Sequence, residues 1–365
     1  MIPMVDVQQQ YQQLKDVIDE GVLGVLASGQ YVLGPQVRAF EEVVADYLGV
    51  EDAIGVASGT DALHLALVAA GIGPGDEVIT SPFTFIATVE AILYVGATPV
   101  FVDIDPRTFN LDVNQLEGAM TPATAAILPV HLYGQPADMD PIMALAEKNN
   151  IIVIEDCAQS FGATYNGKQT GCFGELNCFS FYPSKNIGCF GDGGMVTTKT
   201  KAMGEVVRQL RNHGSSQRYY HQRVGFNSRL DEIQAAILQA KFPHLDTYNK
   251  KRGQVALWYD EAFADTAIVR PYRAEKCTHI FHQYTILHEN RDVIANALRS
   301  ANIGCAIYYP VPLHQQIMMD KAYHSLSFPN AEQAAVSCLS LPMFPEMTQE
   351  QVLQVTEKVL SVCQN

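Results

Sequence analysis

Between about residue 50 and residue 200, short runs of consecutive apolar residues alternate with segments of helical period. A strand that is buried on both faces is apolar throughout, and helices between such strands supply the crossovers that a parallel sheet requires. The alternation therefore predicts an α/β fold with a mainly parallel sheet, covered by helices on both faces. The expected strands are "AIGVA", "DEVIT", "PVFVDI", "AAILPVHL", "IIVIED" and "CFSFY".

The last third of the chain has a different character. The helical stretch "RLDEIQAAILQAKFPHLDTYNKKR" spans residues 229–252, and short helices and strands follow it. We interpret residues 1–250 as a large domain, which includes an N-terminal helical segment and the connecting helix. Residues 251–365 are predicted to form a smaller C-terminal α+β domain.

Composition limits the classes of function. The chain has 365 residues, 48% of them hydrophobic, and a formal net charge of −15. An acidic surface disfavours nucleic acid or an anionic membrane as the main partner, although a local pocket can still bind a phosphorylated small molecule. The eight cysteines are scattered without a CxxC pair, and no apolar stretch is long enough to span a membrane. We therefore expect a cytoplasmic protein with reduced thiols and no zinc site.

The stretch "YPSKNIGCFGDGG" places Lys185 a few positions before a run of glycines. A P-loop has its lysine after the last glycine, at the start of a helix, and here the following "GMVTTK" is strand-like. Two interpretations remain for Lys185. It is an ordinary surface lysine beside a tight turn, or the loop presents its amine as a nucleophile.

Two other strand ends carry polar residues, and ligands of open α/β sheets bind beyond the carboxyl ends of the strands. "AIGVA" runs into Ser58-Gly59-Thr60 and then a helix, whose N-terminus is suited to an anion, although a simple N-cap explains the same residues. "IIVIED" ends at Asp156, with Gln159 three positions on. That carboxylate can hold a positively charged ligand group, or it is an N-cap or a solvated acid.

Phe83 follows "DEVIT", and Ser180 ends "CFSFY". Phe83 is a core residue or an aromatic face for a planar cofactor. Together the strand ends supply a phosphate site, an aromatic face, an acid and a lysine. That set matches pyridoxal 5'-phosphate, whose aldehyde reacts with a lysine amine and whose ring nitrogen is kept protonated by a carboxylate.

The sequence also resembles a known family, the DegT/DnrJ/EryC1/StrS sugar-nucleotide aminotransferases, which have the aspartate-aminotransferase-like fold. The resemblance covers essentially the whole chain. The motifs that carry it are "GQYVLGPQVRAFE", "SGTDALHLAL", "GPGDEVITSPFTFIAT", "PVFVDIDPRTFNLD", "IEDCAQSFGA", "FSFYPSKNIGCFGDGG", "NSRLDEIQAAIL" and "YYPVPLH". It implies a seven-stranded sheet in the large domain and a smaller C-terminal domain.

The resemblance implies a role around the cofactor ring for four residues. Lys185 forms the Schiff base with the cofactor and then carries the proton in the reaction. Asp156 pairs with the pyridinium nitrogen, and Gln159 lies near the phenolic oxygen. Phe83 stacks on the ring.

At the phosphate, the resemblance implies the backbone of Gly59 and Thr60 and the Ser180 hydroxyl. Asn227 completes this site from the neighbouring subunit, so the active enzyme is expected to be at least a homodimer.

The implied reaction is transamination. Glutamate leaves its amino group on the cofactor as pyridoxamine 5'-phosphate, and a nucleotide-linked keto-hexose accepts it; no metal is implied. "NSRLDEIQAAIL" and "YYPVPLH" favour a 3-oxo sugar, whereas members that aminate C4 often have a "YNYR"-like stretch in place of "GFNSR". A 4-oxo-sugar aminotransferase, a sugar dehydratase of the same fold and a non-catalytic cofactor-binding regulator are the alternatives; the dehydratases have histidine in place of Lys185.

The candidate substrate contacts are Arg229, Tyr309 and His314. Arg229 either pairs with a phosphate or carboxylate or lies in a subunit interface. His314 either contacts substrate or packs in a loop on the small domain. Some members with 3-oxo substrates have histidine where this chain has Tyr308.

Overall fold

The computed structural model describes residues 1–363. Its centre is a seven-stranded sheet in which only β9 runs antiparallel to its neighbours, so the predicted mainly parallel α/β sheet is confirmed. In spatial order the strands are β1 (Asp52–Val56), β9 (Gly194–Thr198), β8 (Leu176–Ser180), β5 (Ile152–Asp156), β4 (Thr124–Ile127), β2 (Glu77–Thr80) and β3 (Thr98–Phe101).

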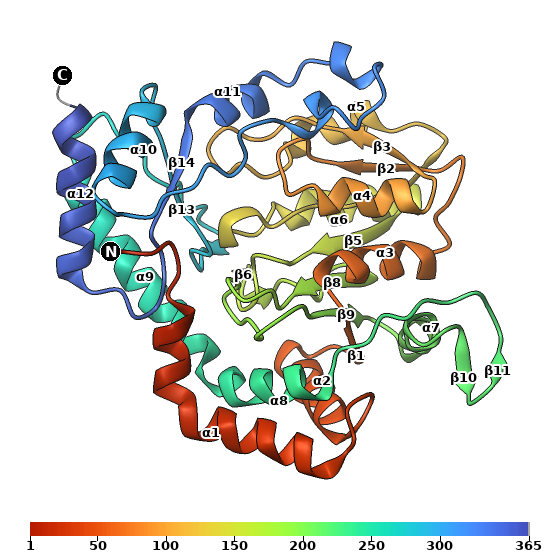
Figure 1. The fold of residues 1–365 in the computed structure, drawn as a ribbon. Helices are drawn as coiled ribbons and strands as arrows, with labels where there is room; N and C mark the ends of the chain where they lie inside the picture. The colour runs from red at the N-terminus through yellow and green to blue at the C-terminus, as the bar shows by residue number, and fades with distance from the viewer. Residues whose placement is uncertain (364–365) are drawn as a thin grey trace.

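Helices cover both faces of this sheet (Figure 1). Successive strand residues face opposite sides, so Ile154 of β5 joins one hydrophobic cluster and Val153 another. The first face is covered by α3 (Gly59–Ala69), α4 (Ala87–Tyr94) and α7 (Lys201–Arg211). The second face is covered by α2 (Pro35–Leu48), α6 (Met139–Asn149) and α8 (Glu232–Lys241).

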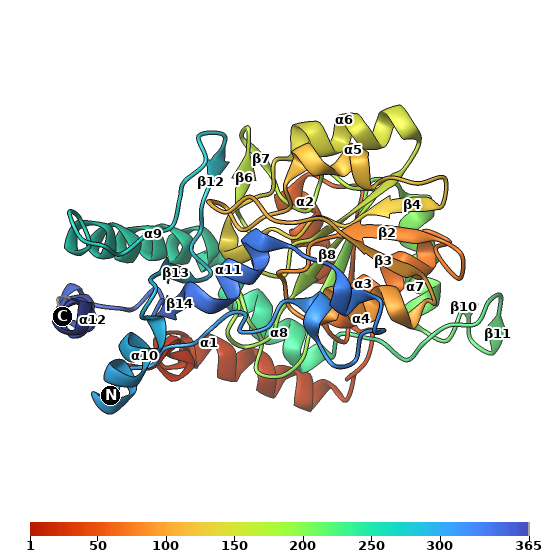
Figure 2. The same ribbon diagram turned by 90° about the horizontal axis from the view of Figure 1, so that it is seen from above.

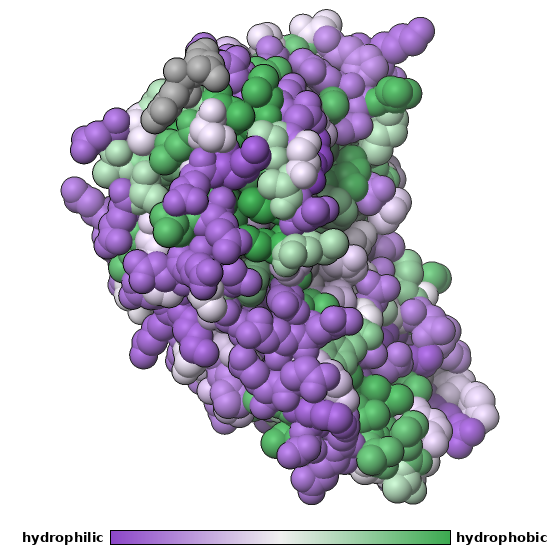
Figure 3. All heavy atoms as spheres, turned by 60° about the vertical axis from the view of Figure 1, so that its left-hand side comes forward, coloured by the Kyte–Doolittle hydropathy of each residue, from purple (hydrophilic) through white to green (hydrophobic). Residues whose placement is uncertain are grey.

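The predicted helix at 229–252 corresponds to α8 and α9 (Leu245–Ala262), joined by one turn of 3-10 helix. The N-terminal helix α1 (Val7–Ser28) packs against α8. Several apolar side chains of α1 point to solvent, among them Val17, Leu23 and Leu26. Figure 3 shows hydrophobic side chains on the right-hand side of the lower end of the molecule, and the end of α1 lies at the lower end in Figure 1.

The C-terminal part has its own hydrophobic cluster, to which α9, α10 (Arg291–Ser300), β13 (Tyr284–Leu287), β14 (Cys338–Leu341) and α12 (Gln349–Cys363) contribute. Ile2 belongs to the same cluster and forms a bridge with Ile303, so the chain's first residues lie against this part. The helix α11 (Pro329–Ser337) instead packs against loops that follow strands of the large sheet. The domain division at residue 250 falls inside α9 and stays a prediction.

Smaller elements complete the description. The strands β6 (Thr164–Tyr165), β7 (Lys168–Gln169) and β12 (Cys277–Thr278) form a second sheet, and α5 (Leu116–Ala119) is a single turn. The strands β10 (Ser215–Gln217) and β11 (Tyr220–His221) form an arm that projects from the body in both ribbon views (Figures 1 and 2). Within residues 1–363, none of the helices has the length and apolar character that crossing a membrane requires.

Candidate active site

A cavity of about 580 Å³ lies beyond the carboxyl ends of β1, β5 and β8, where the strand-end rule places a ligand. Seven of the predicted site residues line it: Gly59, Thr60, Asp156, Gln159, Ser180, Lys185 and Tyr309. Ser58, Thr84, Phe85, Tyr133, Tyr182, His282 and Tyr308 also contribute to its wall. Four predicted residues lie outside this wall: Phe83, Asn227, Arg229 and His314.

The phosphate end of the cavity is built by a close approach of α3 to β8. Ser58 caps α3, and its hydroxyl accepts the N–H of Asp61 at 3.1 Å. The first N–H groups of a helix have no partner within the helix, so those of Gly59 and Thr60 remain available to an anion. A Cβ at Gly59 would lie 2.6 Å from the Cβ of Ser180. Only glycine brings the helix terminus this close to the Ser180 hydroxyl.

The glycines of "YPSKNIGCFGDGG" serve packing instead of phosphate binding. A Cβ at Gly188 would lie 2.6 Å from the carbonyl oxygens of Tyr182 and Pro183, so Gly188 lets the loop fold back on itself. At Gly194 a Cβ would lie 2.3 Å from the Ser58 carbonyl oxygen. These glycines therefore allow the lysine loop and β9 to pack closely against the start of α3.

Lys185 lies on this loop and faces the cavity. Burial lowers the pKa of its amine to about 8, although the nearby Asp156 carboxylate opposes the change. A larger fraction of the amine is therefore neutral and nucleophilic than for a lysine in water. The surface-lysine interpretation does not describe this side chain.

A buried hydrogen-bond network that sequence reasoning missed holds the residue next to the lysine. The Asn186 amide donates to Asn249 Oδ1 at 2.7 Å, and Asn186 Oδ1 accepts from His282 Nδ1 at 3.1 Å. Burial lowers the pKa of His282 well below its usual range, so its ring is neutral. Residues from α9 and from the C-terminal part thus fix the loop that carries Lys185.

Asp156 ends β5 and points into the same cavity. Its Oδ1 accepts the N–H of Ala158 at 3.1 Å, and its Oδ2 accepts the Thr88 hydroxyl at 2.9 Å. Burial raises the pKa of this carboxyl, while the two hydrogen bonds and the positive charge of Lys185 act in the opposite direction. A buried carboxylate opposite a basic amine can hold a second cationic group of a ligand.

Gln159 connects two aromatic residues of the cavity wall. Its Oε1 accepts the N–H of Tyr133 at 2.7 Å, and its Nε2 donates to the Tyr309 hydroxyl oxygen at 3.2 Å. Burial raises the pKa of Tyr309, so the hydroxyl stays neutral and can donate a hydrogen bond.

The structure corrects the prediction for Phe83. Its side chain is 1% exposed and packs against Phe109, with ring centroids 6.1 Å apart. Phe85, two residues later, is 54% exposed and lines the cavity. The strand ends at Thr80, so the direction of both rings is set by the turn that follows and not by strand alternation. We propose Phe85 as the aromatic face for the cofactor.

The structure also corrects the prediction for His314. The side chain is fully buried, its Nε2 lies 3.3 Å from Glu332 Oε1, and its ring edge contacts Phe328. It packs between loops away from the cavity wall. Asn227 is exposed, and Arg229 donates to Asn212 Oδ1 at 3.1 Å. In its own chain neither residue reaches the cavity wall.

Beside Asp156, a buried group of His131, Glu155 and Cys157 has the composition of a metal site. Its ligand atoms are already used. His131 Nδ1 accepts the N–H of Ala137 at 3.0 Å, so its proton is on Nε2, which donates to Glu155 at 2.8 Å. Glu155 also accepts backbone N–H groups from Gly171, Phe173 and Gly174. We interpret the group as a structural hydrogen-bond network that joins β5 to the loop at residues 171–174.

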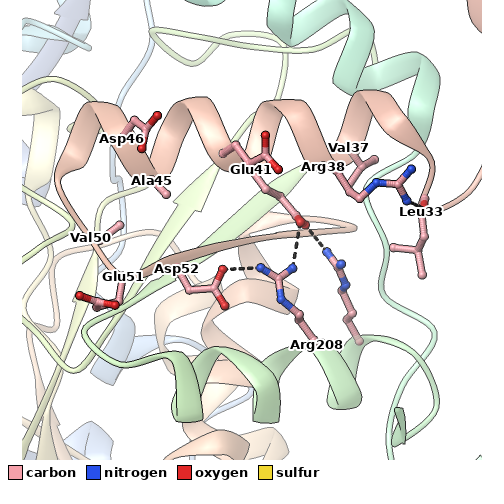
Figure 4. Close-up of a pocket in the computed structure, with 12 residues that line it drawn as sticks. Leu33, Val37, Arg38, Glu41, Ala45, Asp46, Val50, Glu51, Asp52 and Arg208 are labelled. Carbon is pink, nitrogen blue, oxygen red and sulfur yellow. Dashed lines mark hydrogen bonds and ion pairs between the residues drawn. The ribbon is translucent and has the colours of Figure 1, made fainter. Parts of the chain in front are cut away.

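A second cavity, of about 690 Å³, lies between α2, β1 and α7 (Figure 4). Its innermost charges pair with one another: Glu41 lies between Arg208 and Arg211, and Arg208 also contacts Asp52. Glu41 accepts the N–H of Gly55 at 2.8 Å as well. The network ties the strand that leads to Ser58 to two covering helices, which is a structural role.

The residues at the first cavity fit pyridoxal phosphate. The N–H groups at the start of α3 and the Ser180 hydroxyl supply donors for a phosphate, and Asp156 supplies a carboxylate that would pair with a ring nitrogen. Lys185 supplies a buried amine whose pKa is lowered to about 8.

Comparisons with known proteins agree with a site for pyridoxal phosphate. The family model of the DegT/DnrJ/EryC1/StrS aminotransferase family matches residues 12–360. The UDP-N-acetyl-3-dehydro-alpha-D-glucosamine 3-aminotransferase of Acidithiobacillus ferrooxidans is 52% identical over 97% of this chain and 96% of its own length. The UDP-2-acetamido-2-deoxy-3-oxo-D-glucuronate aminotransferase of Pseudomonas aeruginosa is 45% identical over 94% of this chain and 96% of its own length.

Among solved structures, DesV of S. venezuelae, in complex with a ketimine intermediate, superposes with a TM-score of 0.96. It is 42% identical, and the match covers 100% of this chain and 99% of DesV. The aspartate-aminotransferase-like fold, the cofactor and the enzyme class predicted from the sequence are thereby confirmed. The chain belongs to the DegT/DnrJ/EryC1/StrS aminotransferase family, and it is a pyridoxal-phosphate-dependent aminotransferase.

Proposed function

We propose that this enzyme transfers the amino group of glutamate to a nucleotide-linked 3-oxo-hexose, giving an amino-sugar nucleotide, in the cytoplasm. The observation that carries the reaction type is the Lys185 amine, which lines the same cavity as Asp156 and has its pKa lowered to about 8. The names of the two relatives support a UDP-linked 3-oxo sugar. Within residues 1–363 each of the eight cysteines is free, as a reducing compartment would allow.

When bound, pyridoxal phosphate withdraws electrons from the carbon that carries the amino group. Asp156 would keep the ring nitrogen protonated, and Gly59, Thr60 and Ser180 would hold the phosphate. The Lys185 amine would take and return the proton of the reacting carbon. Tyr182, Tyr308 and Tyr309 also line the cavity and would contact the sugar.

The substrate assignment predicts selective turnover. With glutamate as donor, UDP-linked 3-oxo sugars should be aminated at C3, and the matched 4-oxo sugars should react at least about a hundredfold more slowly, since a misplaced carbonyl cannot approach the reacting groups. Product analysis by mass spectrometry and NMR measures both. Turnover of the 4-oxo set alone would identify a C4 aminotransferase. Loss of a hydroxyl without uptake of nitrogen would identify a dehydratase.

We also propose that the active enzyme is a homodimer whose sites are shared between subunits. The projecting arm exposes Tyr219, Tyr220 and Val224, and α1 exposes a further apolar surface. Large exposed apolar side chains of this kind are typical of subunit interfaces. Asn227 is exposed beside the base of the arm, which is where a residue given to a partner's phosphate site would lie.

Subunit mixing tests this proposal. Lys185→Ala removes the amine, and Asn227→Asp places a negative charge beside the phosphate; each variant alone should be inactive or nearly so. If the two residues of one site come from different subunits, a mixed dimer has one intact site. Random mixing should then restore about a quarter of the normal activity. Activity that stays at the level of the separate variants would show that both residues serve the site of their own chain.

A further inference from the structure

Two buried threonines connect the cavity wall with Asp156. Thr88, on α4, donates its hydroxyl proton to Asp156 Oδ2 over 2.9 Å. Thr84, one turn earlier, lies 3.1 Å from Thr88, hydroxyl oxygen to hydroxyl oxygen, and lines the cavity. Both threonines are buried, Thr84 at 1% exposure and Thr88 at 0%, so water does not compete for these contacts.

The direction of this chain of hydrogen bonds follows from the number of protons. An ionised carboxylate only accepts, so the single Thr88 proton goes to Asp156. Thr88 then accepts at its own oxygen, and the Thr84 proton points toward Thr88. Both hydroxyl dipoles therefore have their positive ends toward Asp156, and in such a chain each bond strengthens the next.

Within the described residues, Thr88 is the one side chain that donates a hydrogen bond to Asp156; the other donor is the backbone N–H of Ala158. The positive charge of Lys185 also favours the carboxylate, but that charge is lost when the amine is neutral. The threonine hydroxyl stays in place in both situations.

We propose that Thr88, oriented by Thr84, is a positioning residue that keeps Asp156 ionised and aimed at the ring nitrogen of the bound cofactor. The proposal rests on the proposed role of Asp156 and adds a partner that acts through it. Thr88 itself does not line the cavity.

Thr88→Val removes the hydroxyl and keeps the shape of the side chain. Full-length protein freed of cofactor is titrated with pyridoxal phosphate and with its 1-deaza analogue, in which carbon replaces the ring nitrogen. We expect the variant to bind pyridoxal phosphate roughly 10- to 100-fold more weakly, the effect of one hydrogen bond to a charged group. Affinity for the analogue should change less than about twofold, since no pyridinium is present. Thr88→Ser should restore wild-type values.

Thr356→Val is the matched control, because Thr356 is also buried on a helix but donates to the Leu353 carbonyl in α12. It should leave both affinities unchanged. Thr84→Val should weaken pyridoxal phosphate binding in the same selective way, by a smaller factor. Equal losses for the two ligands in Thr88→Val, or none for either, would overturn the proposal. If the wild type binds the analogue as tightly as pyridoxal phosphate, the role of Asp156 itself fails.

Discussion

Replacing Lys185 by alanine is expected to abolish transamination while the fold remains. The variant lacks both the amine that attaches the cofactor and the group that moves the proton, so the rate should fall by roughly four orders of magnitude or more, as when other enzymes lose their nucleophile. Stopped-flow absorbance with glutamate measures the half-reaction, and circular dichroism reports on folding. Normal turnover in this variant would contradict the whole assignment.

Lys241 provides the internal control for the Lys185 prediction. Burial lowers its pKa to about 8 as well, but its amine donates to the Gly188 carbonyl and does not line the cavity. Borohydride reduction of the wild type should therefore fix the cofactor on Lys185 alone, and a Lys241→Met variant should give the same labelled peptide. The rate at which apoprotein attaches the cofactor should decline as pH falls below about 8, because the reactive form of the Lys185 amine is the neutral one.

The sheet and much of the site could be predicted because simple periodicity determines them. Gly59, Asp156 and Ser180 follow three different strands, and the carboxyl ends of those strands meet at one edge of the sheet. The sequence indicates an anion site at Gly59, between Ser58 and Thr60. The contact of Gly59 with Ser180 could not be predicted, because it depends on the order of the strands in the sheet. The position of the site could thus be predicted from local sequence patterns, whereas its close contacts depend on the topology of the sheet.

The wrong and the missed residues lie in segments whose side-chain directions do not follow helix or strand periodicity. Phe83 and Phe85 both follow β2, and only the turn decides that Phe85 faces the cavity. His314 is buried by a contact with Phe328 on a distant segment. Thr88 approaches Asp156 across 68 residues of sequence. Such pairs leave no local signal, because their partners are chosen by tertiary packing.

Replacing Asp156 by asparagine is expected to lower the transamination rate at least about a hundredfold, the loss found when one preorganised electrostatic partner is removed. Asparagine has nearly the same shape but carries no charge, so the ring nitrogen loses the group that favours its proton. The variant should bind pyridoxal phosphate more weakly. Steady-state kinetics with glutamate and titration of the apoprotein measure the two effects.

A cofactor with a permanent charge separates the electrostatic role of Asp156 from a structural one. N-methyl pyridoxal phosphate has a positive ring nitrogen whatever its surroundings, so it should recover part of the rate lost in Asp156→Asn. The same compound should not help Lys185→Ala, because that variant lacks the amine and not the ring charge. If the asparagine variant is slow with both cofactors, the carboxylate acts mainly by shaping the cavity. Kinetics equal to wild type would remove Asp156 from the mechanism and, with it, the basis for Thr88 as its positioning residue.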